Sequence, residues 1–200
     1  MKKTAVYGGS FDPPHKGHRL LAENLAEKCG ADKVVVIPTA LSPFKNSSSA
    51  SPEERLEMCR LAFDGELFEV SDVEIKRGGK SYTVDTLAEV KKSYPDSQLY
   101  LFMGDDMFLS FDKWYRYEDI MKLAVIVCAC RTENRDKLEK MQDFCKNTLN
   151  CDENGVIISD CIPLEISSTE LRALKGEKMK EYLNENVYNY IVARGLYDCD

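Results

Sequence analysis

The two histidines of this 200-residue chain, His15 and His18, lie three positions apart in the run Gly8-Gly9-Ser10-Phe11-Asp12-Pro13-Pro14-His15-Lys16-Gly17-His18. An apolar segment precedes this run, and a leucine- and alanine-rich helical pattern follows it. This order predicts a strand, a glycine-rich turn and a helix. A helix N-terminus offers unpaired N–H groups and a positive dipole end to an anion. The run therefore predicts a phosphate site in which two imidazoles donate hydrogen bonds as charge builds up.

Two alternatives for this run are weaker. It lacks the spacing of a Walker loop, which needs G-x-x-x-x-G-K-[ST], and that of a dinucleotide fingerprint, which needs G-x-G-x-x-G. Histidine is also tolerated at an exposed helix start without any function. A pair of histidines directly after a Gly-Gly turn favours the phosphate site over that reading.

A second anion site is predicted near the C-terminus, in Ile166-Ser167-Ser168-Thr169-Glu170-Leu171-Arg172. The pattern Ser167-x-x-Glu170 is a capping box, in which a serine and a glutamate satisfy each other's backbone N–H groups at a helix start. A purely structural cap is the alternative for the serines. Arg172, one turn into the helix, favours a phosphate ligand.

Three further residues have both a functional and a structural interpretation. Thr83 is predicted to be the N-cap of a helix that begins at Val84, and an N-cap is often no more than that. Trp114, the only tryptophan, is either a ring that stacks on a ligand or a core residue. Lys45, taken alone, would be a solvated loop lysine.

The elements that must position these residues alternate between short apolar runs and helical patterns. Strands are predicted at 4–7, 33–37, 69–75, 99–103, 124–128 and 156–159, and helices at 18–29, 52–63, 84–93, 117–123, 136–148, 169–174 and 187–194. Alternation of this kind predicts an α/β fold with a doubly wound, Rossmann-like, mostly parallel sheet and helices on both faces. One domain is expected over 1–200, with a small C-terminal helical segment at about 167–197 inside it.

This architecture makes a prediction about the site. Ligands of doubly wound folds bind beyond the carboxyl ends of the strands. The turns after the first, second and fourth strands hold the histidine run, Lys45 and Gly104-Asp105-Asp106. We therefore expect these three polar clusters to converge.

Composition and charge narrow the class of protein. Apolar residues make up 44% and charged residues 30% of the chain, as in folded soluble proteins. The net charge of −7 argues against nucleic acid or an anionic membrane as a partner. Residues 1–50 nevertheless carry seven basic and four acidic side chains, so the positive part coincides with the predicted phosphate site. Neither a signal peptide nor a membrane span is apparent.

The chain is rich in cysteine. We expect free thiols in a cytoplasmic protein rather than disulfides, because no secretory signal is apparent. No C-x-x-C occurs, so a structural zinc site is a weak alternative. The eight cysteines are Cys29, Cys59, Cys128, Cys130, Cys145, Cys151, Cys161 and Cys199.

Four ordered motifs together resemble one protein family. The histidine run resembles the H-x-G-H motif of the nucleotidyltransferase superfamily, and 166–172 resembles its second motif. Between them, the stretch from Arg77 to Leu87 and Gly104-Asp105-Asp106 followed by Trp114-Tyr115 are similar to the bacterial nicotinate-nucleotide adenylyltransferases. The closing Tyr190-Ile191 to Gly195-Leu196-Tyr197 fits the same family. The resemblance extends from residue 4 to residue 197.

The resemblance implies an enzyme of NAD biosynthesis that joins ATP to nicotinate mononucleotide and releases pyrophosphate. It places His15 and His18 in catalysis, on the ATP phosphates, with His18 stabilising charge at the α-phosphorus. The implied ATP-binding residues are Gly8, Gly9, Ser10, Phe11, His15, His18, Gly104, Asp106, Ile166, Ser167, Ser168 and Arg172. The implied acceptor-binding residues are Lys45, Tyr82, Thr83, Asp106, Trp114 and Arg131.

The family also implies individual contacts in the acceptor site. Tyr82 and Thr83 would bind the nicotinate carboxylate, Trp114 would stack on the pyridine ring, and Asp106 would accept from ribose hydroxyls. Thr132-Glu133 replaces the usual Pro-Gly after Arg131, so the loop there departs from the family. No residue is assigned to a metal of its own, because Mg²⁺ is expected to arrive with ATP.

Three other interpretations remain open. A sister transferase would act on nicotinamide mononucleotide or phosphopantetheine, although phosphopantetheine has no pyridine ring for Trp114 to stack on. A fragment of a class I aminoacyl-tRNA synthetase shares the H-x-G-H element, but 200 residues leave little room for a tRNA-binding domain. A nucleotide sensor without catalysis would bind ATP and release no pyrophosphate. Assembly into a homo-oligomer is also left open by the sequence.

Overall fold

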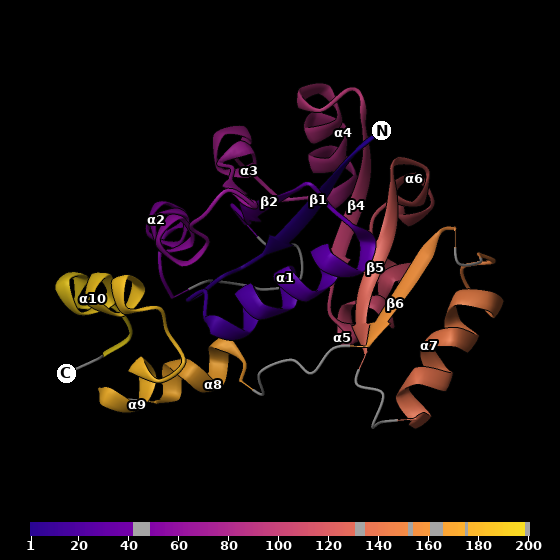
Figure 1. The fold of residues 1–200 in the computed structure, drawn as a ribbon. Coiled ribbons are helices and arrows are strands. Elements are labelled where there is room, and N and C mark those ends of the chain that lie inside the picture. The colour runs from indigo at the N-terminus through magenta and orange to yellow at the C-terminus, as the bar shows by residue number, and fades with distance from the viewer. Residues whose placement is uncertain (42–48, 131–134, 152–153, 161–165, 175, 199–200) are drawn as a thin grey trace. The chain divides into compact units, whose positions relative to one another are not determined.

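The computed structural model describes residues 1–41, 49–130, 135–151, 154–160, 166–174 and 176–198. Strands and helices alternate through most of this length (Figure 1). The strands are β1 (Lys2–Gly9), β2 (Lys33–Pro38), β3 (Phe68–Val70), β4 (Ser97–Met103), β5 (Ala124–Cys130) and β6 (Val156–Asp160). The α-helices are α1 (Lys16–Cys29), α2 (Pro52–Ala62), α3 (Val73–Arg77), α4 (Thr83–Ser93), α5 (Asp105–Phe108), α6 (Tyr117–Leu123), α7 (Arg135–Asn147), α8 (Ser168–Ala173), α9 (Glu177–Lys180) and α10 (Glu185–Arg194).

The strands form one six-stranded sheet in the order β3-β2-β1-β4-β5-β6. The pairings of β1 with β4, β4 with β5 and β5 with β6 are parallel, and their registers align Val6, Leu101, Ile126 and Val156 across the sheet. These four residues are buried, as expected when helices cover a parallel sheet. The strand order is that of doubly wound nucleotide-binding folds. The predicted Rossmann-like fold class is confirmed.

The chain divides into two compact units, each made of several segments. The first comprises Met1–Tyr7, Leu21–Val34 and Tyr82–Pro163. In it, β4 and β5 lie side by side and α4 packs against α6. The second comprises Gly8–Leu20, Val35–Ser81 and Leu164–Asp200, and in it α10 packs against α2. The expectation of one domain over 1–200 stays a prediction.

Most predicted elements are found, with ends displaced by a few residues. The strand prediction for 69–75 is wrong beyond Val70. Alternating Val73 and Ile75 favoured a strand, but α3 begins after Asp72 and ends at Gly78, which has φ +69°. An ion pair of 3.1 Å between Lys76 and Asp72 joins neighbouring turns of this helix. Pro52 and a complete capping box of Ser51 and Glu54 begin α2, as predicted.

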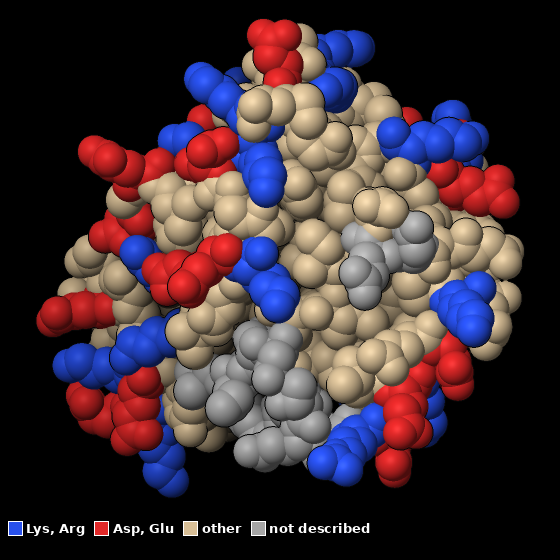
Figure 2. All heavy atoms as spheres, turned by 45° about the vertical axis from the view of Figure 1, so that its right-hand side comes forward, with Lys and Arg blue, Asp and Glu red and all other residues tan. Residues whose placement is uncertain are grey.

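The described cysteines are all thiols in this structure. Cys29, Cys59, Cys128 and Cys130 are buried, whereas Cys145 and Cys151 are partly exposed. Cys161 and Cys199 lie outside the described residues. Among those residues, no helix combines the length and the low polarity that crossing a bilayer requires. Figure 2 shows Lys, Arg, Asp and Glu side chains mixed along the rim of one face, with uncharged surface between them.

Candidate functional site

The two histidines meet at the start of α1, within the second unit. His15 immediately precedes the helix, and its carbonyl oxygen accepts hydrogen bonds from the N–H groups of His18 and Arg19. The two imidazole rings lie with their centroids 3.7 Å apart. The His15 N–H donates to Nδ1 of His18 at 3.2 Å. Because Nδ1 of His18 is an acceptor, the proton of a neutral His18 ring is on Nε2.

His15 is a buried imidazole, with 6% of its surface exposed. Burial lowers its pKa from 6.5 to about 4, because the charged form loses hydration. Its Nδ1 atom has no hydrogen-bond partner among the described residues. A neutral ring with an unsatisfied nitrogen is unusual in a protein interior, and such groups often mark functional sites.

The segment before His15 is shaped by Phe11. This residue is buried, has φ +46°, and packs edge-on against His18 and Phe63 with centroid distances of 5.1 and 5.7 Å. A Cβ on Gly9 would meet the Phe11 ring at 3.0 Å, whereas a Cβ on Gly8 would meet nothing within 4 Å. Both glycines belong to β1, so the expected glycine-rich turn begins only at Ser10. Gly9 therefore makes room for Phe11, and Gly8 leaves the backbone open to a ligand.

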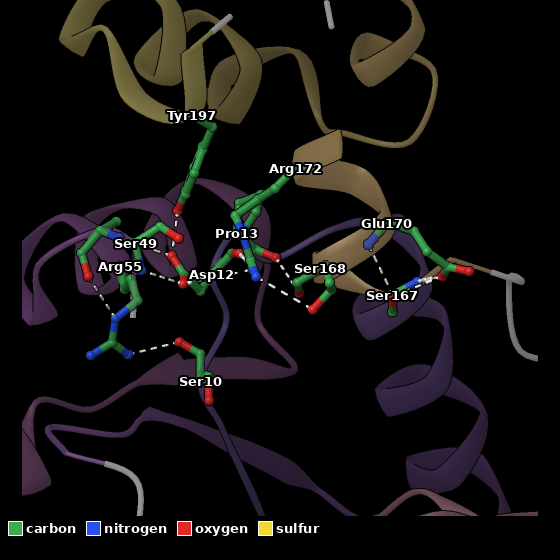
Figure 3. Close-up of polar contacts among 12 residues, drawn as sticks. Ser10, Asp12, Pro13, Ser49, Arg55, Ser167, Ser168, Glu170, Arg172 and Tyr197 are labelled. Atoms are coloured by element: carbon green, nitrogen blue, oxygen red, sulfur yellow. Dashed lines mark hydrogen bonds and ion pairs between the residues drawn. The ribbon is translucent and has the colours of Figure 1, made fainter. Parts of the chain in front are cut away.

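The second motif forms the N-terminus of α8, and the predicted capping box is present. The Glu170 N–H donates to Oγ of Ser167 at 3.1 Å, and the Ser167 N–H donates to the Glu170 carboxylate at 2.8 Å. The Ser168 hydroxyl donates to the Pro13 carbonyl at 3.0 Å, and Arg172 Nη1 donates to the Asp12 carbonyl at 2.6 Å (Figure 3). The structure thus brings the predicted phosphate residues of α8 to the segment before His15. Ile166 lies half-buried directly before the cap.

Asp12 is a central residue of this site that the sequence analysis did not assign. Its carboxylate accepts from the N–H groups of Ser49 and Ala50 at 2.7 and 3.0 Å and from the Tyr197 hydroxyl at 2.8 Å. Figure 3 shows Ser49 and Tyr197 pointing toward Asp12 from separate segments. Asp12 stands inside the histidine run, but its partners are distant in sequence. A single sequence therefore offers no local signal for this role.

Arg55 is a second residue that the sequence analysis missed. It is 1% exposed and lies on the buried face of α2. Its guanidinium donates to the carbonyls of Ser10 at 2.7 Å, Thr39 at 2.6 Å and Ala50 at 3.3 Å. Arg55 stands three, four and seven positions before the apolar residues Met58, Cys59 and Ala62. This helical spacing is the signal in the sequence that could have placed Arg55 on the buried face of the helix. Arg55 therefore connects the backbone at Thr39 and at Ala50 with the histidine run at Ser10.

Gly104 and Asp106 lie at the end of β4, within the first unit. Gly104 is the N-cap position of α5, and a Cβ there would meet nothing within 4 Å. The Asp106 side chain is 85% exposed and forms an ion pair with Lys137 at 3.2 Å. Lys137, from α7, also pairs with Asp105 at 2.6 Å. These contacts hold the start of α7 against the turn that carries Asp106, and the sequence analysis assigned neither Lys137 nor Asp105.

The predicted acceptor residues of the same unit lie around the start of α4. Tyr82 is the N-cap position and Thr83 the first helical residue, so the prediction of Thr83 as the cap is wrong by one position. The ring of Tyr82 lies 4.8 Å from that of the exposed Tyr115. Trp114 is partly exposed and packs edge-on against Phe111. Its partial exposure leaves surface for a ligand, which a fully buried tryptophan would not have.

Two predicted residues lie outside the described part of the chain. They are Lys45, expected to hold a phosphate, and Arg131, expected near the acceptor. Their predicted roles stay predictions. Within the described residues, no three or more His, Cys, Asp or Glu side chains gather in a way that could hold a metal ion.

Comparison with known proteins identifies the family. The model of the cytidylyltransferase-like family matches residues 6–174. A probable nicotinate-nucleotide adenylyltransferase of Hydrogenobaculum is 35% identical over 196 residues, which cover 96% of this chain and 97% of that protein. Probable enzymes of the same description from Aquifex aeolicus and Clostridium tetani are 43% and 34% identical, over 70% and 98% of this chain and 83% and 100% of those proteins.

Solved structures agree on the fold. The nicotinic acid mononucleotide adenylyltransferase of Plasmodium falciparum, complexed with NaAD, aligns with a TM-score of 0.75 at 19% identity, over 100% of this chain and 99% of that one. The crystal structure of a protein from Vibrio parahaemolyticus, described as a "Putative Nicotinate-nucleotide Adenylyltransferase", aligns with a TM-score of 0.66 at 21% identity, over 98% and 96% of the two chains. With the family model over most of the chain and relatives above 30% identity along nearly all of it, this protein belongs to the nicotinate-nucleotide adenylyltransferase family.

Proposed function

We propose that this protein transfers the adenylyl group of MgATP to nicotinate mononucleotide, forming nicotinate adenine dinucleotide and pyrophosphate in NAD biosynthesis. The observation that carries the proposal is the close pair of His15 and His18 at the start of α1; Ser168 and Arg172 bind the segment just before this pair. Imidazole, hydroxyl and guanidinium donors gathered at a helix N-terminus suit a polyphosphate. Membership of the family supports the same reaction.

The reaction needs no protein nucleophile. A phosphate oxygen of nicotinate mononucleotide attacks the α-phosphorus of ATP in line. A new P–O bond forms, the bond to the bridging oxygen breaks, and pyrophosphate leaves with the electron pair. The enzyme contributes positioning and charge stabilisation. His18 is suited to stabilise the α-phosphate because its Nδ1 is held as an acceptor, which leaves Nε2–H as the donor.

The divalent ion enters as part of the nucleotide substrate in this proposal. MgATP carries its own ion on the phosphates, and Mg²⁺ commonly binds proteins through substrate phosphates and few carboxylates. The protein's role is then to hold phosphate oxygens through Gly8, Gly9, Ser10 and the histidines. Gly104 and Asp106 would bind the adenosine side, where the exposed Asp106 carboxylate can accept from ribose hydroxyls.

The acceptor is chosen at the start of α4. The first N–H groups of a helix have no partner within it, so they and the helix dipole stabilise the nicotinate carboxylate more than a neutral amide. Tyr82 and Thr83 would provide this contact, Trp114 would stack on the pyridine ring, and Lys45 and Arg131 would bind the acceptor phosphate and its surroundings. The enzyme would work in the cytoplasm, where the thiols of Cys145 and Cys151 stay reduced.

A parallel assay tests the proposal. Pyrophosphate release is measured with MgATP and, separately, nicotinate mononucleotide, nicotinamide mononucleotide or phosphopantetheine. We expect release with the nicotinate acceptor to exceed release with either of the others. Faster turnover of the amide would make the protein a sister transferase. Tight ATP binding without release from any acceptor would identify a nucleotide sensor and overturn the proposal.

A further inference from the structure

We propose that Asp12 and Tyr197 form a positioning pair that holds the Arg172 guanidinium in place for the polyphosphate of the nucleotide. The inference rests on the proposed function only for the identity of that nucleotide. Neither residue is expected to touch the reacting atoms. Their contribution is to fix the position of a side chain that does bind the substrate.

The carboxylate of Asp12 is buried and accepts several hydrogen bonds. Its side chain is only 6% exposed. One oxygen accepts from Ala50 N–H and the Tyr197 hydroxyl, and the other accepts from Ser49 N–H and lies 3.7 Å from Arg172 Nη1. Donors from residues 49–50 and from Tyr197 hold this carboxylate in one position. A carboxylate held in this way can in turn fix the position of Arg172.

Arg172 reaches Asp12 from α8. Its Nη1 donates to the Asp12 carbonyl at 2.6 Å, and its Nη2 lies 3.3 Å from the Thr169 hydroxyl. The guanidinium is therefore held on one side by Asp12 and on the other by its own helix. Arg172 is still partly exposed, with 27% of its side chain accessible. A held but accessible guanidinium can bind an anion at a low cost in side-chain entropy.

The backbone at this contact has an unusual conformation in two places. Tyr197 has φ +61° and Phe11, next to Asp12, has φ +46°. Such left-handed conformations are strained for residues other than glycine, and they persist where surrounding contacts determine them. Burial, and then the charge of Asp12, raise the pKa of Tyr197 far above its usual range. Its hydroxyl therefore remains a donor at every working pH.

A role of Asp12 in charge balance and a role in positioning Arg172 predict opposite effects of Asp12→Asn on ATP binding. Arg55 and Arg172 both lie near Asp12. If Asp12 served only to balance these cations, Asp12→Asn would make the site more positive and would tighten ATP binding. If Asp12 positions Arg172, the same change weakens ATP binding although the charge becomes more favourable.

The experiment measures the dissociation constant of MgATP by calorimetry with no acceptor present. Tyr197→Phe removes one hydroxyl, and Tyr188→Phe, a half-buried tyrosine of α10, is the matched control. We expect Tyr197→Phe and Asp12→Asn to raise the dissociation constant about fivefold or more, and Tyr188→Phe to leave it unchanged. We also expect the Tyr197→Phe effect to vanish in an Arg172→Ala background, because the pair acts through Arg172.

Each other outcome has a defined meaning. Unchanged ATP binding in Tyr197→Phe, with only a lower melting temperature, would reduce the pair to a structural contact and overturn the inference. An equal Tyr197→Phe effect with and without Arg172 would also overturn it, as would tighter binding in Asp12→Asn. If Asp12→Asn fails to fold, the MgATP dissociation constant of Tyr197→Phe, with and without Arg172, tests the inference by itself. Absence of pyrophosphate release by the wild type would count against the proposed reaction, not against this result.

Discussion

Nδ1 of His18 accepts a hydrogen bond from the His15 backbone N–H at 3.2 Å, and the centroids of the two imidazole rings lie 3.7 Å apart. The backbone of one histidine therefore sets the tautomer of the other. Burial of the His15 ring lowers its pKa to about 4, because the charged form would lose its hydration. His15 is therefore a neutral ring near pH 7.

The lowered pKa of His15 predicts a pH-dependent stability. The folded pKa is about 4 and the ordinary value is 6.5, so the unfolded chain binds more protons between these values. The free energy of unfolding of the nucleotide-free protein should therefore fall as the pH drops from 6.5 toward 4, by up to about 3 kcal/mol from this group. Urea titrations at several pH values measure it. The fall should be shallower in His15→Gln, and identical profiles for the two proteins would contradict the assignment.

Alanine at Gly9 should lower the stability of the protein, whereas alanine at Gly8 should affect nucleotide binding and leave the stability nearly unchanged. Gly9→Ala drives a Cβ against the buried Phe11 ring and should lower the free energy of unfolding by about 1–3 kcal/mol. Gly8→Ala places its Cβ in open space, so its stability should change by less than about 0.5 kcal/mol. If the triphosphate approaches the backbone at Gly8, that variant should still bind ATP more weakly. Normal ATP binding by a stable Gly8→Ala protein would remove Gly8 from the site.

The proposed preference for the acid over the amide can be tested at the Thr83 N–H, one of the first N–H groups of α4. Thr83 is the first residue of α4 and Tyr82 has φ −93° and ψ 127°, so a proline at 83 fits this backbone. Thr83→Pro removes the N–H donor, and Thr83→Ala removes only the hydroxyl. We expect Thr83→Pro to reduce the ratio of kcat/KM for nicotinate over nicotinamide mononucleotide about tenfold, by loss of a hydrogen bond to a charged group. A ratio that stays at the wild-type value in both variants would refute this contact.

Cys145 and Cys151 should form a disulfide on oxidation. Their sulfur atoms are 3.0 Å apart, and the Cys151 N–H donates to the carbonyl of Cys145 in the last turn of α7. With hydrogen peroxide, the two thiols lose two protons and two electrons, an S–S bond forms, and the peroxide is reduced to water. Peptide mapping after thiol alkylation should find this bond in wild type and in Cys29→Ser, and not in Cys145→Ser. Full alkylation of both cysteines after peroxide would show the prediction to be wrong.

The sequence is most informative where the interactions are local. The capping boxes at Ser51 and Ser167 are complete in the structure, because each joins residues three positions apart. The doubly wound sheet follows from alternating patterns of period two and 3.6. The wrong strand prediction at 73–75 also comes from such a local pattern. The short run Val73-Glu74-Ile75 alternates between apolar and polar residues as a strand does, although it forms part of helix α3.

The candidate site is less predictable because its supporting contacts are long-range. The histidines, Ser168 and Arg172 could be found from motifs. Their connections through Asp12 and Tyr197, which are 185 positions apart, depend on the folded chain. Local spacing identifies which side chains can bind an anion, whereas only tertiary structure identifies what holds them.

Pyrophosphate release by His18→Ala tests the central claim most directly. The measurement uses saturating MgATP and nicotinate mononucleotide, with melting curves to confirm that the variant is folded. If Nε2–H of His18 stabilises the charge at the α-phosphate, kcat should fall by about 100-fold or more. Turnover close to that of the wild type in a folded His18→Ala protein would contradict the account.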